Sequence, residues 1–447
     1  MRKQRTLTEG NVVSTMLAFA VPFLLANLLQ ACYGAADLLI IGQFSDAANL
    51  SAVSTGSQIM QMVTSIVSGL TTGGTVLIGR YTGAREYKDV SETIGTMFTL
   101  FGIFAIVMTA GVILLMDPIV SVMQTPQEAY LATKQYVLIC ICGTLFIFGY
   151  NAISAILRGM GDSRNPLIFI AIACVLNIAG DLILVGPLRM GAAGAAFATA
   201  GSQGVSMIIA VLYLRRKKFV FDFNLKSFRI HRAKAKNLIK IGLPISLQES
   251  LVMLSFLFII AIVNSMGVVA SAAIGITQKI DTFTLLPPSA FSAAIAAMTA
   301  QNMGAGLPDR AKKCMHTGVW FSLVFGVVFF ALMQLAPQAA MRVFTQDAGV
   351  VLAGEGYLRS FSFDCILVCF VFCMNGFFNG CGHTAFTMFN NLLPTFLVRI
   401  PAAYLLSRIA GATLFEIGFA APLASVVSVV FGFIYLKTGR WKQNSLA

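Results

Sequence analysis

The chain has 447 residues, of which 57% are hydrophobic and only 11% are charged. Soluble domains carry about 25% charged residues, so this composition excludes a soluble enzyme, an aqueous binding module and a disordered chain. In a soluble protein the net charge of +13 would suggest nucleic acid as a partner. Here the basic residues lie between long apolar runs, so we interpret them as signals of membrane topology and expect no nucleic-acid partner.

Apolar runs of about 20 residues or more recur along the whole chain and predict membrane-spanning helices, because lipid offers backbone polar groups no partner. These continuous runs do not match the short alternating strands of an outer-membrane barrel. The first run follows a basic N-terminus without a small-residue cleavage site, so we expect a retained helix rather than a signal peptide. Twelve segments are predicted: 13–42, 50–79, 93–116, 131–156, 165–187, 191–215, 238–264, 270–300, 315–337, 355–380, 384–408 and 412–437.

The basic residues predict how the twelve helices are oriented. Most of the 31 Lys and Arg residues fall in the N-terminus, the loops after the second, fourth and eighth segments, the linker 215–240 and the C-terminus. Lys and Arg concentrate in the cytoplasmic loops of membrane proteins. We therefore expect a multi-pass protein of the cell inner (cytoplasmic) membrane with both termini in the cytoplasm.

The linker divides the chain into two halves that resemble each other at an offset of about 221 residues. Three of the matching pairs are Pro22 with Pro244, Gln58 with Gln278, and Gly159 with Gly380. A direct repeat of six helices is typical of secondary transporters, whose site lies near mid-membrane between the repeats. We predict an N-terminal six-helix lobe (1–214), a basic cytoplasmic linker (215–237) and a C-terminal six-helix lobe (238–447).

Asp37 and Asp181 are acidic residues inside predicted spans of the first half. A charge at the bilayer centre costs about 2.5–3.5 kcal/mol on insertion scales, so each one indicates a function. Asn177 lies four residues before Asp181 on the same helix face, and Thr199 lies on a small-residue segment that allows close helix approach. These oxygens could hold a proton or a hard monovalent cation. Alternatively, the two acids satisfy neighbouring backbone or pair with a buried arginine.

The second half contains Glu249 and Asp364 within predicted spans, and these two residues could form a second acidic site. Lys279 and Asp281 are two residues apart on one helix, so they would not face each other. Arg399 could neutralise a carboxylate in a purely structural role. For this half, both the functional and the structural interpretation stay open.

The sequence lacks motifs of enzymes and of metal or cofactor sites. It contains no GxxxxGK[ST], HExxH or GxSxG pattern, so we predict neither ATP-driven export nor catalysis by this chain, and we expect no cofactor. The nine cysteines include no CxxC pair and lie mostly within apolar runs. There they fit small buried packing residues better than metal ligands or disulfides.

The sequence contains 36 phenylalanines and 20 methionines, and most of these side chains must face lipid or the core. A subset lining a cavity would suit flat or amphiphilic cations, because such walls repack around varied ligands and attract positive charge. Gln58 and Gln278 occupy equivalent positions in the two halves, and they are our candidates for residues of a substrate cavity.

Several motifs resemble those of one known family. They are QNMGAG at 301–306, its first-half counterpart GRYTGA at 79–84, LRGMGD at 157–162 and Pro22 in the first segment. With these motifs the chain resembles, over essentially its whole length, the multidrug and toxic compound extrusion (MATE) transporters. The resemblance implies an all-α integral membrane protein with twelve transmembrane helices in two pseudo-symmetric six-helix lobes. It also implies a secondary antiporter that exports organic, often cationic, compounds in exchange for H⁺ or Na⁺ by alternating access.

The resemblance also assigns roles to residues. Asp37 matches the family's acidic residue of the first helix, and Asn177, Asp181 and Thr199 look like the amino-lobe cation site of the DinF-like branch. Two further acids, Glu249 and Asp364, look like the carboxy-lobe acidic pair of the NorM-like branch. The implied partners are small organic cations or drugs and the lipid bilayer, with antibiotic resistance as a phenotype, and we expect a monomer.

Two other functions fit the same architecture. A flippase for lipid-linked oligosaccharide or peptidoglycan precursors would need a cavity that opens toward lipid and is rich in basic residues, whereas the first half offers acids. A membrane scaffold or sensor without transport would leave the costly intramembrane acids without a role. The linker 215–240 is also too short for a signalling domain.

Overall fold

The computed structural model describes residues 7–217 and 219–443, which form helices and short loops, with no β-strand among them. The chain's first half contains α1 (Val12–Phe44), α2 (Ala47–Gly83), α3 (Tyr87–Leu114), α4 (Met116–Val122), α5 (Gln127–Cys142), α6 (Thr144–Gly159), α7 (Arg164–Leu184), α8 (Gly191–Arg216) and the 3₁₀-turn η1 (Leu225–Ser227). The second half contains α9 (Arg232–Asn264), α10 (Val268–Gly304), α11 (Pro308–Leu335), α12 (Pro337–Arg342), α13 (Ala348–Cys381), α14 (Thr384–Pro394), the π-helix η2 (Thr395–Arg399), α15 (Ile400–Ser407), α16 (Leu414–Gly418), α17 (Ala420–Thr438) and the 3₁₀-turn η3 (Arg440–Lys442).

The predicted all-helical membrane fold is confirmed, and each of the twelve predicted segments coincides with a helix or a closely spaced group of helices. Ten helices within the described ranges are long and apolar enough to cross a membrane, and the bent pair α5–α6 makes an eleventh. Several helices begin earlier than predicted; α9, for example, starts at Arg232 inside the expected linker. Hydropathy marks the apolar part of a helix, whereas a polar first turn continues the same backbone hydrogen bonding.

Some predicted segments contain breaks that the hydropathy pattern did not indicate, as in 412–437, which is divided into α16 and α17. The segment 131–156 is bent by 47° where α5 meets α6. The break falls at Gly143, where a β-carbon would lie 2.7 Å from the side chain of Ala200 on α8. The segment 384–408 is divided into α14, η2 and α15, because Pro394 ends α14 and a π-helical stretch follows. Proline lacks the N–H that continues the ladder, so a local change of helix type is expected there.

The chain divides into two compact units whose boundaries lie inside helices. The first unit holds Val21–Ser246, and the second holds residues 7–20 together with 247–443. Helix α1 passes from the second unit to the first just before Pro22, and α9 passes from the first to the second just after Pro244. Each unit is thus completed by the first part of a helix that continues in the other. The lobe limits 1–214, 215–237 and 238–447 stay a prediction.

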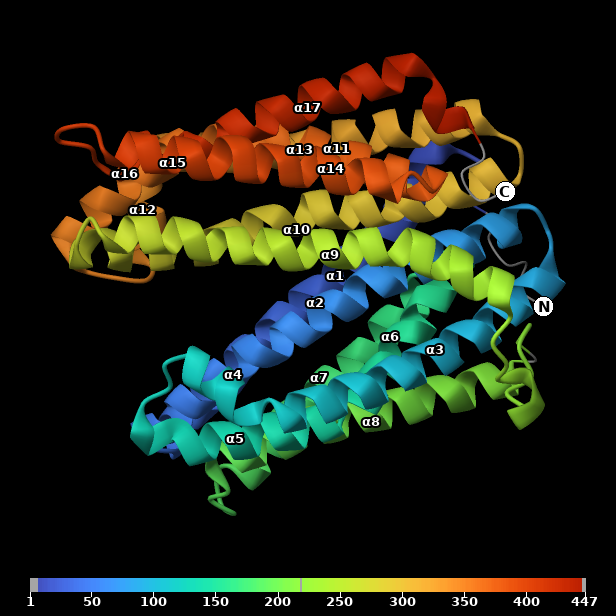
Figure 1. Cartoon of the computed structure of the whole chain (residues 1–447), viewed down its shortest axis with the longest axis horizontal. Helices are drawn as coiled ribbons and strands as arrows, with labels where there is room; N and C mark the ends of the chain where they lie inside the picture. The colour runs from blue at the N-terminus through green and yellow to red at the C-terminus, as the bar shows by residue number, and fades with distance from the viewer. Residues whose placement is uncertain (1–6, 218, 444–447) are drawn as a thin grey trace. The chain divides into compact units, whose positions relative to one another are not determined.

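Within each unit the helices pack lengthwise. In the first unit α2 contacts α5 and α6, while α7 and α6 contact α8; in the second, α10 and α17 contact α13 (Figure 1). Glycines allow the closest approaches. A β-carbon on Gly73 of α2 would lie 2.8 Å from the Cα of Gly242 on α9, and one on Gly69 would meet the backbone of Ser246. The glycine-rich stretch of α2 therefore serves as a close-packing surface for the first part of α9.

The QNMGAG motif anchors the start of the described chain within the second unit. The Leu7 N–H donates to Gln301 Oε1 at 3.0 Å, and Asn302 Nδ2 donates to the Leu7 carbonyl at 3.3 Å. Leu7 also shares a buried hydrophobic cluster with Met16 of α1 and Trp441 of η3. Residues near both ends of the described chain therefore belong to one hydrophobic cluster of this unit.

Candidate functional site

The four polar residues predicted for the first half lie together inside the first unit. Asp37 comes from α1, Asn177 and Asp181 come from α7, and Thr199 comes from α8. Asp37 is 6% exposed, Asn177 1% and Asp181 0%, so each has been taken out of solvent. Helix geometry places Asn177 and Asp181 on one face of α7, and both point toward the same partners.

Small residues bring α8 close enough to α7 to complete the cluster. A β-carbon on Gly180 would lie 3.0 Å from the β-carbon of Ala198, and Gly194 approaches the backbone of Leu184 similarly. Larger residues at these positions would hold the two helices apart. The small-residue face that the sequence indicated therefore positions the hydroxyl group of Thr199 beside α7.

The Thr199 hydroxyl bridges Asp37 and Asn177. It donates to Asp37 Oδ2 at 3.4 Å and accepts from Asn177 Nδ2 at 3.3 Å. The carboxyl groups of Asp37 and Asp181 lie within hydrogen-bonding reach of each other. Two carboxylates can stay this close in a low-dielectric interior only when a proton or a cation lies between them.

The cluster contains more acceptors than donors. Asp37 Oδ1, Asn177 Oδ1 and both carboxyl oxygens of Asp181 have no hydrogen-bond partner among the described residues. The ion pairs formed within the described ranges involve neither aspartate. Burying such acceptors without a donor costs free energy. Four buried acceptor oxygens without donors in one cluster are chemically suited to a proton or a small hard cation.

Two tyrosines near Asp37 did not emerge from the sequence analysis. Tyr33 and Tyr136 both interact electrostatically with Asp37 and with Cys140. The Tyr136 hydroxyl is also 3.1 Å from the Ser57 hydroxyl. Tyr33 could have been found, because it lies four residues before Asp37 and therefore on the same face of α1. Tyr136 comes from α5, and its sequence position gives no such signal.

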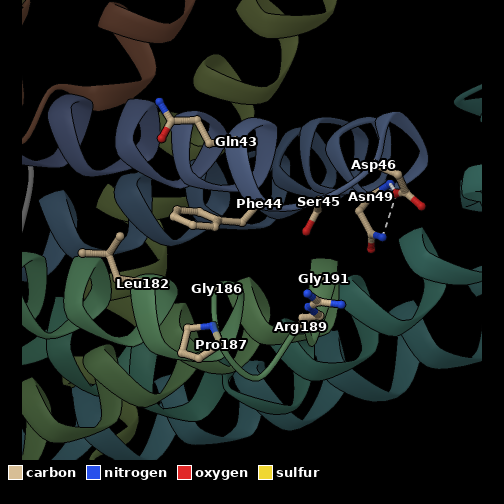
Figure 2. A pocket seen from close by; sticks show the side chains of 10 residues that line it. All are labelled: Gln43, Phe44, Ser45, Asp46, Asn49, Leu182, Gly186, Pro187, Arg189 and Gly191. Carbon is tan, nitrogen blue, oxygen red and sulfur yellow. Dashed lines mark hydrogen bonds between the residues drawn. The ribbon is translucent and has the colours of Figure 1, made fainter.

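A pocket of about 660 Å³ lies in the first unit beyond the cluster, where α1 ends and the α7–α8 loop turns back. Figure 2 shows Phe44, Ser45 and Asn49 on one side of it and Pro187 and Arg189 on the other. Phe44 is seven residues beyond Asp37, on the same face of α1 and about 10 Å further along the axis. Ile41, which is fully buried, lies between these two levels. The pocket thus lies about two turns of α1 beyond the cluster, on the predicted outer side, and buried side chains separate the two.

Asn49 fixes the loop that forms the far wall of this pocket. Asn49 Oδ1 accepts from the Ala192 N–H at 2.8 Å, while its own N–H and Nδ2 donate to Asp46 Oδ1. Gly191 has a φ of +54°, and a β-carbon there would lie 2.4 Å from Asn49 Oδ1, so this close approach requires glycine. The hydrogen bonds from the backbone and side chain of Asn49 lower the pKa of Asp46.

The remaining candidates are placed differently. Glu249 lies on α9 with its side chain exposed, and it is not among the residues that interact with Asp364. Asp364 of α13 is buried and interacts instead with Ser425 and Arg399. Gln58 is exposed in the first unit, and Gln278 is half-buried in the second. The acidic pair and the glutamine-lined cavity stay predictions.

Comparison with known proteins gives matches over the whole chain. The MatE family model matches residues 22–183 and 244–405, two repeats that begin at Pro22 and Pro244. The probable multidrug resistance protein YpnP of Bacillus subtilis (strain 168) is 29% identical over 444 residues, with 99% of each chain covered. A MOP superfamily transporter from Pyrococcus furiosus superimposes with a TM-score of 0.92 at 19% identity, again over 99% of both chains. An outward-facing multidrug resistance MATE family transporter gives the same TM-score, identity and coverage.

Proposed function

The chain belongs to the MatE family of transporters, and from that premise we propose that it is a secondary multidrug antiporter that exports organic, often cationic, compounds in exchange for H⁺ or Na⁺. It is a transporter and not an enzyme. The names of its relatives, among them the multidrug export protein MepA of Staphylococcus haemolyticus, support multidrug efflux as its activity. We place it in the cell (cytoplasmic) membrane as a monomer with both termini in the cytoplasm, working without a resident cofactor.

The observation that supports coupling best is the set of four acceptor oxygens without donors in the Asp37–Asp181 cluster. One proton or one small cation would satisfy several of them at once. Charged drugs and the coupling ion both carry positive charge, so they can compete for the same carboxylates. This competition is the simplest physical basis for exchange, because binding of one favours release of the other.

The proposed cycle requires two states that the ligands stabilise to different extents. A cation entering past Phe44 from the outside would bind the cluster and favour one state, and the drug would favour the other. A ligand that binds both states equally shifts nothing. In this proposal the Asp364 carboxyl of the second unit belongs to a separate site, while Gln58 and Gln278 contact the drug.

The test is dye efflux from membrane vesicles with H⁺ and Na⁺ gradients imposed separately. Ethidium efflux driven by one of these gradients, and lost in the Asp37→Asn variant, is the expected result. Asp117→Asn is the matched control, because Asp117 is an exposed acid bound to Lys134 and lies outside the cluster. Gradient-driven efflux that persists at the wild-type rate in Asp37→Asn would refute the assignment of the coupling site.

A further inference from the structure

Segment 219–231 of the basic linker is a folded part of the first unit, between the end of α8 and the start of α9 (Figure 1). Its Phe221, Phe223 and Phe228 pack with Phe98 of α3, and five pairs of these four ring centroids lie 5.1–6.1 Å apart. Two of the linker rings, Phe221 and Phe223, are buried. Aromatic pairs of this kind stabilise a fold beyond the area that they bury. The middle of the linker is therefore fixed on α3.

Backbone contacts hold the same segment against α3. A β-carbon on Gly95 would lie 2.2 Å from the Ser227 carbonyl oxygen, so this approach requires glycine. The Thr96 hydroxyl accepts from the His231 N–H at 3.1 Å and lies 3.3 Å from the Arg229 carbonyl oxygen. Because His231 directly precedes α9, these contacts determine where α9 begins and how its first turns are oriented.

The acidic residues around the linker are already engaged within the protein. Asp89 of α3 forms an ion pair with Lys234, and Glu92 Oε2 lies 3.7 Å from His231 Nδ1. Asp222 accepts hydrogen bonds from neighbouring residues of the linker. These carboxylates therefore have partners of their own and do not neutralise the remaining basic side chains of the linker.

The first turns of α9 place part of this positive charge on one face. The linker 215–240 carries ten Lys and Arg residues and one acidic residue. Arg232, Lys236 and Lys240 follow each other at intervals of four, so they share one helix face over about 12 Å. All three are exposed, and Arg232 and Lys236 take part in none of the ion pairs formed among the described residues. A phosphate group next to this face would meet a row of positive charges.

The same face becomes apolar where α9 enters the predicted membrane segment (238–264). Ile239 and Leu243 lie on it and are 37% and 56% exposed. The opposite face is covered, because Leu238 and Ile241 are buried. A row of basic side chains that continues into exposed apolar side chains matches an anionic phospholipid beside the helix, with the phosphate at the basic level and the acyl chains at the apolar level.

We propose that this face of α9 is a binding site for an anionic phospholipid of the cytoplasmic leaflet. Arg232, Lys236 and Lys240 bind the phosphate, and the exposed apolar residues of the next turn contact the acyl chains. The general excess of basic residues on the cytoplasmic side requires only their number, whereas this site requires their fixed spacing along one face. Since α9 continues from the first unit into the second, the bound lipid contacts a helix that both units share.

The test is equilibrium binding of phosphatidylglycerol with a fluorescent acyl chain to the full-length protein in detergent, compared with phosphatidylcholine that carries the same chains. The wild type should bind phosphatidylglycerol at least tenfold more tightly, and added salt should weaken only this binding. One basic residue near anionic headgroups contributes about fivefold to affinity. Arg232→Gln combined with Lys236→Gln should therefore lower the affinity for phosphatidylglycerol tenfold or more and leave that for phosphatidylcholine unchanged.

Lys312→Gln combined with Lys313→Gln is the matched control. Both lysines are exposed in the first turns of α11, but as neighbours in sequence they do not share one helix face. This control should leave both affinities unchanged. The midpoint of thermal unfolding should be the same in both double variants, and the comparison of the two lipids on the wild type requires no variant at all.

Three results would overturn the proposal: equal wild-type affinities for the two lipids, an unchanged affinity in the α9 variant, or an equal loss in the α11 control. Displacement of the bound lipid by millimolar inorganic phosphate would also overturn it, because the basic residues alone would then hold the anion. Each of these measurements is made without transport, so failure of the lipid site and failure of the proposed antiport remain distinguishable.

Discussion

Asp37 on α1 and Asp181 on α7 place their carboxyl groups within hydrogen-bonding reach of each other, inside one unit and away from solvent. Mutual repulsion would separate two ionised groups at this distance. In the proposed antiporter, a shared proton or a bound cation is the third participant that keeps the pair together. Each function considered for this chain has to account for that pair.

The Thr199 hydroxyl should contribute measurably to cation affinity. Thr199→Val keeps the shape of the side chain but removes the group that donates to Asp37 and accepts from Asn177. A hydrogen bond to a charged group is worth about 1.5–3 kcal/mol, so we expect the affinity of the coupling ion to fall about tenfold or more. Thr199→Ser should retain near-wild-type affinity. Equal affinities for the valine and serine variants, measured by ion titration of thermal stability, would contradict the role of the hydroxyl.

The approach of α2 to the first part of α9 should depend on Gly73. In Gly73→Ala the added methyl group would meet the Gly242 backbone, and overpacking of this kind costs about 1–3 kcal/mol. Gly102→Ala on α3 is the control, because no atom lies within 4 Å of that position. We expect a lower midpoint of thermal unfolding in detergent for Gly73→Ala only. A similar midpoint for both variants would show that this contact is looser than described.

The hydrogen bonds that Gln301 and Asn302 make with the Leu7 backbone should stabilise the second unit. Asn302→Ala removes the donor to the Leu7 carbonyl and leaves that buried carbonyl without this partner. The expected loss is about 1–3 kcal/mol, visible as a lower midpoint of thermal unfolding and faster proteolysis before α1. Gln346→Ala, at an exposed residue of the same unit, should change neither quantity. Loss of stability in the control but not in Asn302→Ala would contradict this account.

The Asp46 cap should titrate below the usual range for aspartate. The Asn49 backbone and side chain donate to its ionised form and lower its pKa below the ordinary 3.8. The cap therefore stabilises the start of α2 above about pH 4, and this contribution is lost as pH falls through the lowered pKa. Carbon-13 NMR of labelled aspartate should show a midpoint under 3.8 that rises in Asn49→Ala. An unchanged midpoint in that variant would mean that Asn49 does not set it.

The sequence predicts the helices well because their cause is local. An apolar run in lipid has to be helical, and the i, i+4 spacing of Asn177 and Asp181 places both on one face without further information. The breaks depend on contacts between distant segments. At Gly143 the bend accompanies the approach of Ala200, which no pattern within residues 131–156 reveals.

The interactions among Asp281, Asp364 and Arg399 in the second unit could not be predicted for the same reason. Asp281 and Asp364 come from α10 and α13, and Arg399 is the last residue of the π-helix η2. Ideal α-helical spacing assigns that side chain to a different face. The sequence therefore identified the charged residues one by one, whereas the partnership among them depends on the packing of three helices.

The most direct measurement of the central claim is cation release on drug binding to the purified protein. Addition of ethidium to wild-type protein in weakly buffered solution should release a proton, or Na⁺ that was bound beforehand. Asp117→Asn should behave as the wild type does, and Asp37→Asn should release neither ion. Ethidium binding without release in the wild type, or equal release in Asp37→Asn, would contradict exchange at the Asp37–Asp181 cluster.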